Sequence, residues 1–125
     1  MENQKKILIV DDDEFLLDMY VRKFQESGFA VEIAQNGQEA IEKAKKTNPD
    51  AILLDIVMPK MDGFEALRTM KKEHIAPKAA IFILSNLGQR EDTERGLDLG
   101  AVDYIVKAHF TPSEVVARVN NVLHK

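Results

Sequence analysis

The sequence contains no cysteine and no tryptophan, and it has no apolar run long enough to cross a membrane. The absence of cysteine excludes a disulfide framework and a thiolate metal site, and it is compatible with a reducing compartment. Near the N-terminus only the short run from Ile7 to Val10 precedes a series of aspartates, which is too short for a signal-peptide core or a transmembrane helix. We therefore expect a soluble cytoplasmic protein with no membrane partner.

An excess of basic residues is also missing. Lys and Arg number 17 against 21 Asp and Glu, which gives a formal net charge of −4. Because nucleic-acid binding usually leaves a clustered basic surface, we expect no direct contact with nucleic acid. The 125 residues are about the size of one domain and can bury roughly two thirds of the unfolded surface. We predict one domain over residues 1–125, with no separate output domain among them.

What the sequence does contain is a set of short apolar runs that each end on a polar residue. The polar residues that follow these runs are Asp11, Asp12 and Asp13, then Asp55, Ser85 and Lys107. Segments with helical periodicity separate the runs, which is typical of buried strands in a parallel sheet. Because all strands of such a sheet point the same way, we expect these residues at one edge, where open α/β sheets bind ligands.

The alternation of strand and helix, repeated five times with short connections, predicts an α/β fold: a doubly wound parallel sheet with helices on both faces. Strands are expected at 5–10, 30–34, 51–54, 80–84 and 102–106, and helices at 13–27, 37–47, 63–73, 89–99 and 112–124. The first helix should have an apolar face made of Phe15, Leu16, Met19, Tyr20 and Phe24. The last helix begins with Thr111-Pro112-Ser113-Glu114, which predicts a capping box.

Three carboxylates at the predicted edge, Asp11, Asp12 and Asp55, require compensation of their charge. Two carboxylates about 4 Å apart repel by roughly 4 kcal/mol at an effective dielectric constant near 20. Mg²⁺ would supply the opposite charge, because it takes oxygen ligands and is commonly held by one or two carboxylates plus a phosphate. Helix capping explains only one aspartate, which we assign to Asp13. At the same edge, the hydroxyl of Ser85 and the ammonium of Lys107 are suited to donate hydrogen bonds to a phosphoryl group.

These residues form one larger pattern with their neighbours in the sequence. Its parts are Asp11-Asp12, the segment Leu54-Asp55-Ile56-Val57-Met58-Pro59-Lys60-Met61-Asp62-Gly63, Ser85, Tyr104-Ile105-Val106-Lys107 and Phe110-Thr111-Pro112. The pattern resembles the receiver domain of two-component response regulators, in particular the stand-alone receivers that are similar to chemotaxis regulators. The resemblance covers nearly the whole chain, and it implies a flavodoxin-like (βα)5 fold with sheet order 2-1-3-4-5.

The resemblance implies a role for each residue of the predicted site. Asp55 would be the phosphoacceptor and would share Mg²⁺ with Asp12, a direct ligand. Asp11 would act mainly through a water on the metal, and the backbone carbonyl of Val57 would complete the protein ligands. Ser85 and Lys107 would hold the phosphoryl oxygens.

Two further features concern switching and the loop after the lysine. Ser85 and Tyr104 match the switch residues of the family, since the inward or outward position of the aromatic side chain reports phosphorylation in many receivers. The alternative for Tyr104 is a half-buried tyrosine with a hydrated hydroxyl. The sequence departs from the family at Ala108, where receivers usually carry proline, often in cis. A cis bond before alanine would cost about 2.5–4 kcal/mol.

The function implied is that of a signalling switch rather than an enzyme. A sensor histidine kinase or a histidine phosphotransfer protein would donate one phosphoryl group to Asp55. The chain would assist its own phosphorylation and dephosphorylation. It would signal through the face formed by residues 89–99, 102–106 and 112–124, to a downstream protein or a second copy of itself.

Three other classes of protein remain as alternatives. Asp11-Asp12-Asp13 also fits the Asp-x-Asp motif of haloacid-dehalogenase-type phosphatases, whose nucleophile would be Asp11, but that interpretation leaves Asp55 and its Met-Pro segment unexplained. A flavin carrier is disfavoured because four consecutive acids from Asp11 to Glu14 would repel the flavin phosphate. A pseudo-receiver would bind partners without chemistry, and the complete set of acids, hydroxyl and lysine argues against it.

Overall fold

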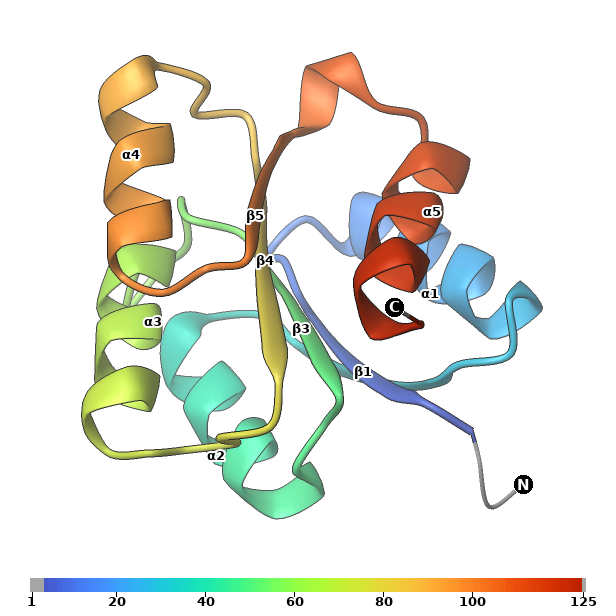
Figure 1. The fold of residues 1–125 in the computed structure, drawn as a ribbon, viewed down its shortest axis with the longest axis horizontal. Helices are drawn as coiled ribbons and strands as arrows, with labels where there is room; N and C mark the ends of the chain where they lie inside the picture. Colours follow the sequence, from blue (N-terminus) through green and yellow to red (C-terminus); the bar gives the residue numbers. More distant parts are fainter. Residues whose placement is uncertain (1–3, 125) are drawn as a thin grey trace.

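Five parallel strands form one sheet in the order β2-β1-β3-β4-β5, with helices packed on both of its faces (Figure 1). The structure, a computed structural model, describes residues 4–124. The strands are β1 Lys6–Val10, β2 Ala30–Ala34, β3 Ala51–Leu54, β4 Ala80–Ser85 and β5 Asp103–Val106. The strand order and the parallel pairing confirm the predicted fold class.

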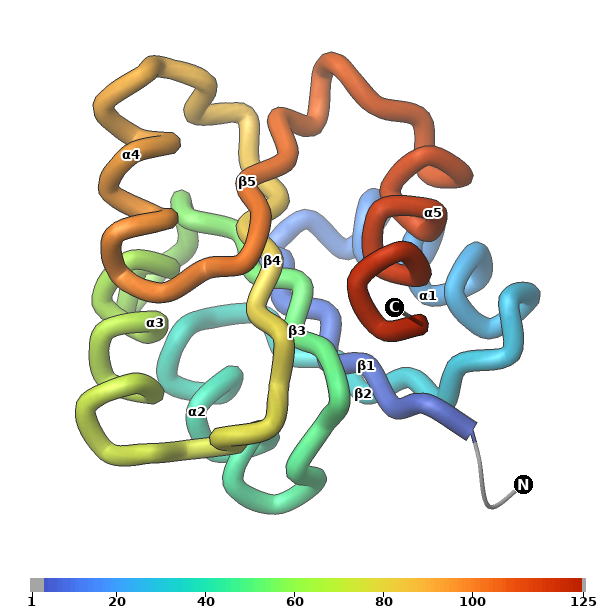
Figure 2. The backbone as a smooth tube through the Cα atoms, viewed as in Figure 1, coloured from blue at the N-terminus to red at the C-terminus, as the bar shows by residue number. Residues whose placement is uncertain are grey.

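The helices divide into two layers. The first layer contains α1 Glu14–Glu26 and α5 Pro112–Leu123, and the second contains α2 Gly37–Thr47, α3 Gly63–Lys72 and α4 Arg90–Asp98. The backbone trace in Figure 2 shows α1 and α5 side by side, across the sheet from α2, α3 and α4. Each predicted helix is present, and its ends differ from the prediction by one residue at most.

The sheet separates two apolar cores because successive side chains of a strand point to opposite faces. Ile7 and Ile9 of β1 pack toward α1 and α5, whereas Leu8 and Val10 pack toward the other layer. All four residues of β3 are buried, since helices cover this central strand on both sides. Burial on both faces explains why the strands are continuous apolar runs rather than alternating sequences.

The start of α1 confirms one prediction and corrects another. The carboxylate of Asp13 accepts hydrogen bonds from the amides of Phe15 and Leu16, so Asp13 is the N-cap as predicted. The predicted buried face was wrong at Phe15, whose side chain is 85% exposed, while Leu17 is buried in its place. Apolar residues surround the first two turns of this helix, so periodicity alone placed Phe15 on the buried face in error, whereas the other four predicted residues do pack in this core.

The end of the chain also matches its local sequence. Thr111 caps α5, and Thr111 and Glu114 form both hydrogen bonds of the predicted capping box. Between β5 and α5, a short 3-10 helix, η1, spans Lys107–His109. No cis peptide bond occurs within the described residues, so the Lys107–Ala108 bond is trans. None of the described helices is long and apolar enough to span a bilayer.

Candidate functional site

The carboxyl ends of β1 and β3 bring three acidic side chains together. Asp11 and Asp55 directly follow these two strands, and Asp12 follows Asp11. Oxygens from the three carboxylates lie within 4.8 Å of one another. Asp11 and Asp55 are buried, with exposed fractions of 2% and 6%, whereas Asp12 is exposed. The predicted acidic cluster therefore forms at the predicted edge of the sheet.

Lys107 joins this cluster from the end of β5. Its ammonium Nζ lies 2.7 Å from Asp11 Oδ2 and 3.0 Å from Asp55 Oδ2. The Lys107 side chain is only 9% exposed, so both ion pairs are shielded from solvent. The second oxygens of the two acids bind backbone: Asp11 Oδ1 accepts from the amide of Asp13 and Asp55 Oδ1 from the amide of Ile56. These four contacts fix the orientation of both carboxylates.

The electrostatics of this cluster follow from its burial. Burial raises the pKa of Asp55 above its usual value, and the charge of Asp11 adds to the rise, although Lys107 and the Ile56 amide oppose it. Burial alone would lower the pKa of Lys107, but its hydrogen bond to Asp11 and the charges of Asp55 and Asp11 outweigh burial and raise that pKa. Lys107 therefore stays protonated at neutral pH. The ionised form of Asp55 is less well stabilised here than the ionised form of an aspartate exposed to water.

The donor set fits a hard divalent cation. Three ionised carboxylates and one ammonium leave a net charge of minus two in this cluster. All three potential ligands are oxygens, which Mg²⁺ prefers over nitrogen and sulfur. The exposed Asp12 forms no side-chain hydrogen bond within residues 4–124, so its carboxylate is free to act as a ligand. The side chain of Val57, two residues after Asp55, is also exposed.

A close backbone contact holds the loop after Asp55 against the site. A Cβ atom on Gly63 would overlap the carbonyl oxygen of Asp55, so only glycine allows α3 to begin at this point. The amide of Gly63 donates to the carbonyl of Ile56 at 2.9 Å, which closes the loop. Asp62 then caps α3 by accepting from the amide of Glu65. The Met-Pro-Lys-Met-Asp-Gly segment, Met58 to Gly63, thus returns the chain to Asp55 and Ile56 and holds the loop against the end of β3.

Ser85 and Tyr104 lie next to the acidic cluster but on the other side of the sheet. Ser85 is buried, with only 1% of the residue exposed. Its hydroxyl oxygen accepts a hydrogen bond from the amide of Leu87 at 3.3 Å and forms none with the acids. The Tyr104 hydroxyl donates to the carbonyl of Leu87, and its ring is buried. Burial, with the charges of Asp92 and Asp55, raises the pKa of Tyr104 to about 12. Tyr104 is thus buried rather than half-buried, and its hydroxyl binds a backbone carbonyl; its role as a switch residue stays a prediction.

The sequence-based reasoning missed one residue that supports this arrangement. Gly96 in α4 faces the sheet, and a Cβ atom there would lie 2.5 Å from Ile83 Cδ1 and 2.9 Å from Tyr104 Cδ2. The missing side chain makes room for the inward ring of Tyr104. A glycine inside a helical pattern is costly and usually has a packing reason, and this cost was the sequence signal that would have identified it.

Comparisons with known proteins agree with this geometry. The response regulator receiver domain family matches residues 7–120. The alkaline phosphatase synthesis transcriptional regulatory protein PhoP of Bacillus subtilis is 38% identical over 97% of this chain and 49% of its own length. The chain spans about half the length of the curated relatives that it matches.

Solved structures show the same fold. A CheY-like receiver domain protein from Methanospirillum hungatei superposes with a TM-score of 0.89 at 30% identity, covering 98% of this chain and 95% of that one. The CheX-CheY-BeF3-Mg²⁺ complex of Borrelia burgdorferi matches with a TM-score of 0.86 at 34% identity, covering 97% and 90%. By its sequence, its fold and the residues at the edge of its sheet, this chain belongs to the response regulator receiver domain family.

Proposed function

We propose that this chain is a phosphorylation-dependent switch in which Asp55 accepts the phosphoryl group. Receiver domains of response regulators serve in general as signalling switches. The observation that carries the assignment of Asp55 is the buried Lys107 ammonium, which bridges Asp11 and Asp55 at the carboxyl edge of the sheet. Burying three charges is costly, and stability alone rarely accounts for it. An incoming dianionic group would use all of them.

The proposed reaction needs no general base. A carboxylate oxygen of Asp55 attacks the phosphorus of a phosphohistidine on a histidine kinase or a phosphotransfer protein. A P–O bond forms, the donor's P–N bond breaks, and the bonding electrons stay on the ring nitrogen, while the other ring nitrogen of the donor carries a proton so that neutral imidazole leaves. Because the attacking carboxylate is already ionised, the protein contributes mainly orientation and compensation of charge.

Each residue of the cluster then has a defined task. Lys107 and Ser85 donate hydrogen bonds to the phosphoryl oxygens, and Asp11 orients Lys107 through the ion pair that it already forms. Mg²⁺ would be held by Asp11, Asp12, Asp55 and the backbone carbonyl of Val57. When bound, the cation supplies positive charge between the carboxylates and the phosphoryl oxygens. The Borrelia burgdorferi CheY, which was solved with BeF3 and Mg²⁺, supports this assignment by similarity.

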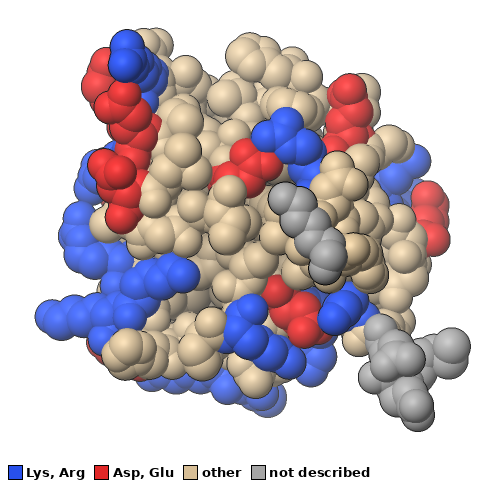
Figure 3. Space-filling view, in the orientation of Figure 1, with Lys and Arg blue, Asp and Glu red and all other residues tan. Residues whose placement is uncertain are grey.

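The output would pass through the face formed by α4, β5 and α5. Tyr104 of β5 reaches the loop after Ser85 through its bond to Leu87, so a phosphoryl group held by Ser85 would disturb this contact. Leu97 of α4 and Val102, which directly precedes β5, expose apolar side chains at this face. Figure 3 shows acidic side chains along the outer side of α4 and basic ones lower on the same side of the molecule.

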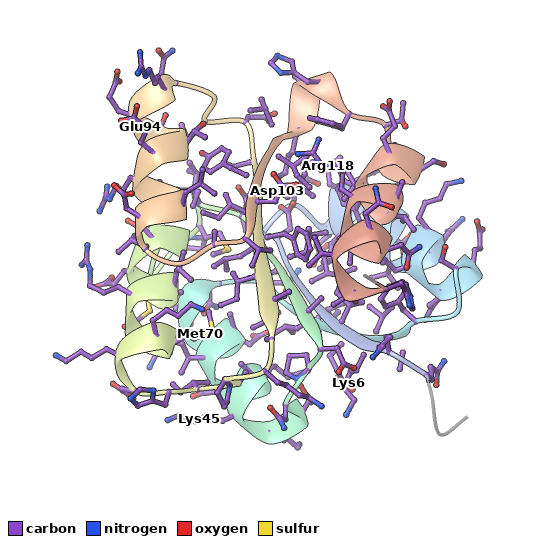
Figure 4. All side chains as sticks on the ribbon, viewed as in Figure 1. Lys6, Lys45, Met70, Glu94, Asp103 and Arg118 are labelled. Atoms are coloured by element: carbon purple, nitrogen blue, oxygen red, sulfur yellow. The ribbon has the colours of Figure 1, made fainter. Side chains whose placement is uncertain are left out.

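The same face has a rigid polar element. Arg118 of α5 and Asp103 of β5 point toward each other in Figure 4, and two hydrogen bonds of 2.9 and 2.8 Å join them. This ion pair fixes α5 to the strand that carries Tyr104. We propose that a downstream protein or a second copy of the chain binds here.

The phosphatase alternative, with Asp11 as the nucleophile, has less support. Asp11 has its two oxygens engaged by Lys107 and the Asp13 amide, and the family that matches the chain is that of receivers. The relatives that match over about half of their own length are transcriptional regulators. Whether the responder is joined to this chain or separate, it must recognise the proposed output face.

The experiment is labelling with acetyl phosphate in the presence of Mg²⁺, followed by intact mass measurement. We expect one phosphoryl group per chain, and none in Asp55→Asn. Asp62→Asn is the matched control, because Asp62 carries a nearby carboxylate whose capping role asparagine retains. Stoichiometric labelling of Asp55→Asn would show that Asp55 is not the acceptor. A native protein that takes up no label with Mg²⁺ present would favour the pseudo-receiver.

A further inference from the structure

The charged cluster belongs to one face of the sheet. Ile9, Leu53 and Ile105 point toward α1 and α5 from β1, β3 and β5. Two positions further along each of these strands come Asp11, Asp55 and Lys107. Hydrogen bonds from the amide of Asp11 to the carbonyl of Ala34 and from the amide of Asp55 to the carbonyl of Val10 continue the sheet to these two acids, and the ammonium of Lys107 binds both of them. The alternation of side chains therefore directs the cluster toward α1 and α5.

Tyr20 of α1 packs in the core under this face. It is 3% exposed, and of the described residues that form this core it alone carries a hydroxyl group. Side chains of a helix lean toward its N-terminus, and the N-terminus of α1 begins just after Asp11 and Asp12. The tyrosine hydroxyl is thus directed back toward the acidic cluster. No side-chain hydrogen bond within residues 4–124 involves it, and no fully buried side-chain oxygen or nitrogen of these residues lacks a partner, so the Tyr20 oxygen keeps some contact with solvent at the edge of the core and is free to accept a hydrogen bond.

The electrostatic environment of Tyr20 agrees with this placement. Burial raises its pKa, the charge of Lys107 lowers it, and the charges of Asp11 and Asp55 raise it again. All three of these charges belong to the site. By contrast, the charges that raise the pKa of Tyr104 are those of Asp92 and Asp55. Tyr104 lies in the core on the opposite face of the sheet. The two tyrosines of the chain therefore flank the site from opposite sides.

We propose that Tyr20 is a positioning residue for Lys107. The ammonium has three N–H donors, and in this state two of them bind Asp11 and Asp55. On the proposed function, on which this inference rests, Lys107 turns from Asp55 to a phosphoryl oxygen. The Tyr20 oxygen then accepts the third N–H from the core side, which holds the ammonium in line with the phosphoryl group.

The first test observes the hydroxyl environment directly. In protein that carries Tyr104→Phe and 3-fluorotyrosine, Tyr20 is the sole tyrosine and gives one ¹⁹F resonance. We expect this resonance to move when beryllofluoride and Mg²⁺ are added, together with the amide resonance of Asp55. If the Asp55 amide moves and the fluorine resonance does not, the role of Tyr20 is refuted while the proposed function stands. If neither moves, the proposed function is wrong and the inference falls with it.

The second test is the rate of labelling by acetyl phosphate. Tyr20→Phe keeps the buried ring and removes one hydrogen-bond acceptor, so the rate should fall about three- to ten-fold. In a Lys107→Ala background the same substitution should change the rate by less than about two-fold, because the group it positions is gone. Phe24→Leu, one turn further along the same buried side of α1, controls for general loss of packing. Equal slowing by Tyr20→Phe in both backgrounds would assign Tyr20 a purely structural role. If labelling of the Lys107→Ala protein is too slow to measure, the ¹⁹F experiment alone decides whether Tyr20 has this role.

Discussion

Gly96→Ala should lower the stability of the protein and expel Tyr104 from its inward position. At an exposed helix position, replacing glycine with alanine stabilises by about 0.8–1.0 kcal/mol. Gly96 is buried, however, and the new Cβ would lie 2.5 Å from Ile83 Cδ1 and 2.9 Å from Tyr104 Cδ2. Optimal carbon contacts are about 3.5–4.0 Å, so both neighbours have to move.

The size of the effect follows from the balance of these two contributions. Overpacking of this kind costs about 1–3 kcal/mol. Subtracting the gain in helix propensity leaves a net loss of about 0–2 kcal/mol. The terminal methyl of Ile83 can rotate, but the Tyr104 ring is held by its hydrogen bond to Leu87, which contributes about 1 kcal/mol. Since this bond costs less to break than a severe overlap, we expect the ring to leave.

Two measurements check this prediction. Urea denaturation gives the change in the free energy of unfolding. Iodide quenching of tyrosine fluorescence reports exposure, because the chain has no tryptophan and both tyrosines are buried. Quenching should rise in Gly96→Ala. In a Tyr104→Ala background the sign should reverse, and Gly96→Ala should stabilise by up to about 1 kcal/mol. A gain of that size in the native background, with quenching unchanged, would refute the packing argument.

Two further predictions concern the acidic cluster. Mg²⁺ at ten times its dissociation constant should stabilise the protein by about 1.4 kcal/mol in thermal unfolding. Asp12→Ala should abolish this gain, with little effect on the metal-free protein because Asp12 is exposed. An undiminished gain in Asp12→Ala would exclude Asp12 as a ligand. Burial raises the pKa of Asp55, so the folded state favours its protonated form, and the stability linked to this group is present at low pH and lost as pH rises through its folded pKa. Asp55→Asn should accordingly be more stable than the native protein at neutral pH, and this difference in stability should shrink on acidification below the folded pKa of Asp55. Denaturant midpoints measured across the pH range test this. A difference in stability that grows toward low pH would contradict it.

The sequence predicted the sheet and its polar edge because both depend on local patterns. A buried parallel strand is a continuous apolar run, and the residue that follows it must lie at the carboxyl edge. This argument predicts that Asp11, Asp55 and Lys107 lie together, and the two ion pairs of Lys107 confirm it. The cap at Asp13 and the capping box at Thr111 were also predictable, because each depends on residues within one turn.

Contacts between distant segments were not predictable in this way. Phe15 and Leu17 are both apolar, and only the packing of α1 on the sheet decides that Leu17 is buried. The pairing of Gly96 with Tyr104 depends on how closely α4 approaches β5. The placement of Tyr20 under the charged cluster depends on the alternation of side chains along three strands at once.

The loop after Lys107 shows how tertiary contacts replace a local constraint. The sequence lacks the proline expected at position 108, and the peptide bond there is trans. A 3-10 turn forms instead, with the amide of Phe110 donating to the carbonyl of Lys107 at 3.4 Å. The Arg118 guanidinium lies over the ring of Phe110, 4.9 Å from its centre, and the same guanidinium binds Asp103 of β5. Because Arg118 binds both Phe110 of the loop and Asp103 of β5, the strand that directly precedes Lys107, it holds the two ends of this connection together. The lysine is therefore anchored by side-chain packing that begins on α5, and a change at the output face that moves Arg118 will also move the group that contacts Asp55.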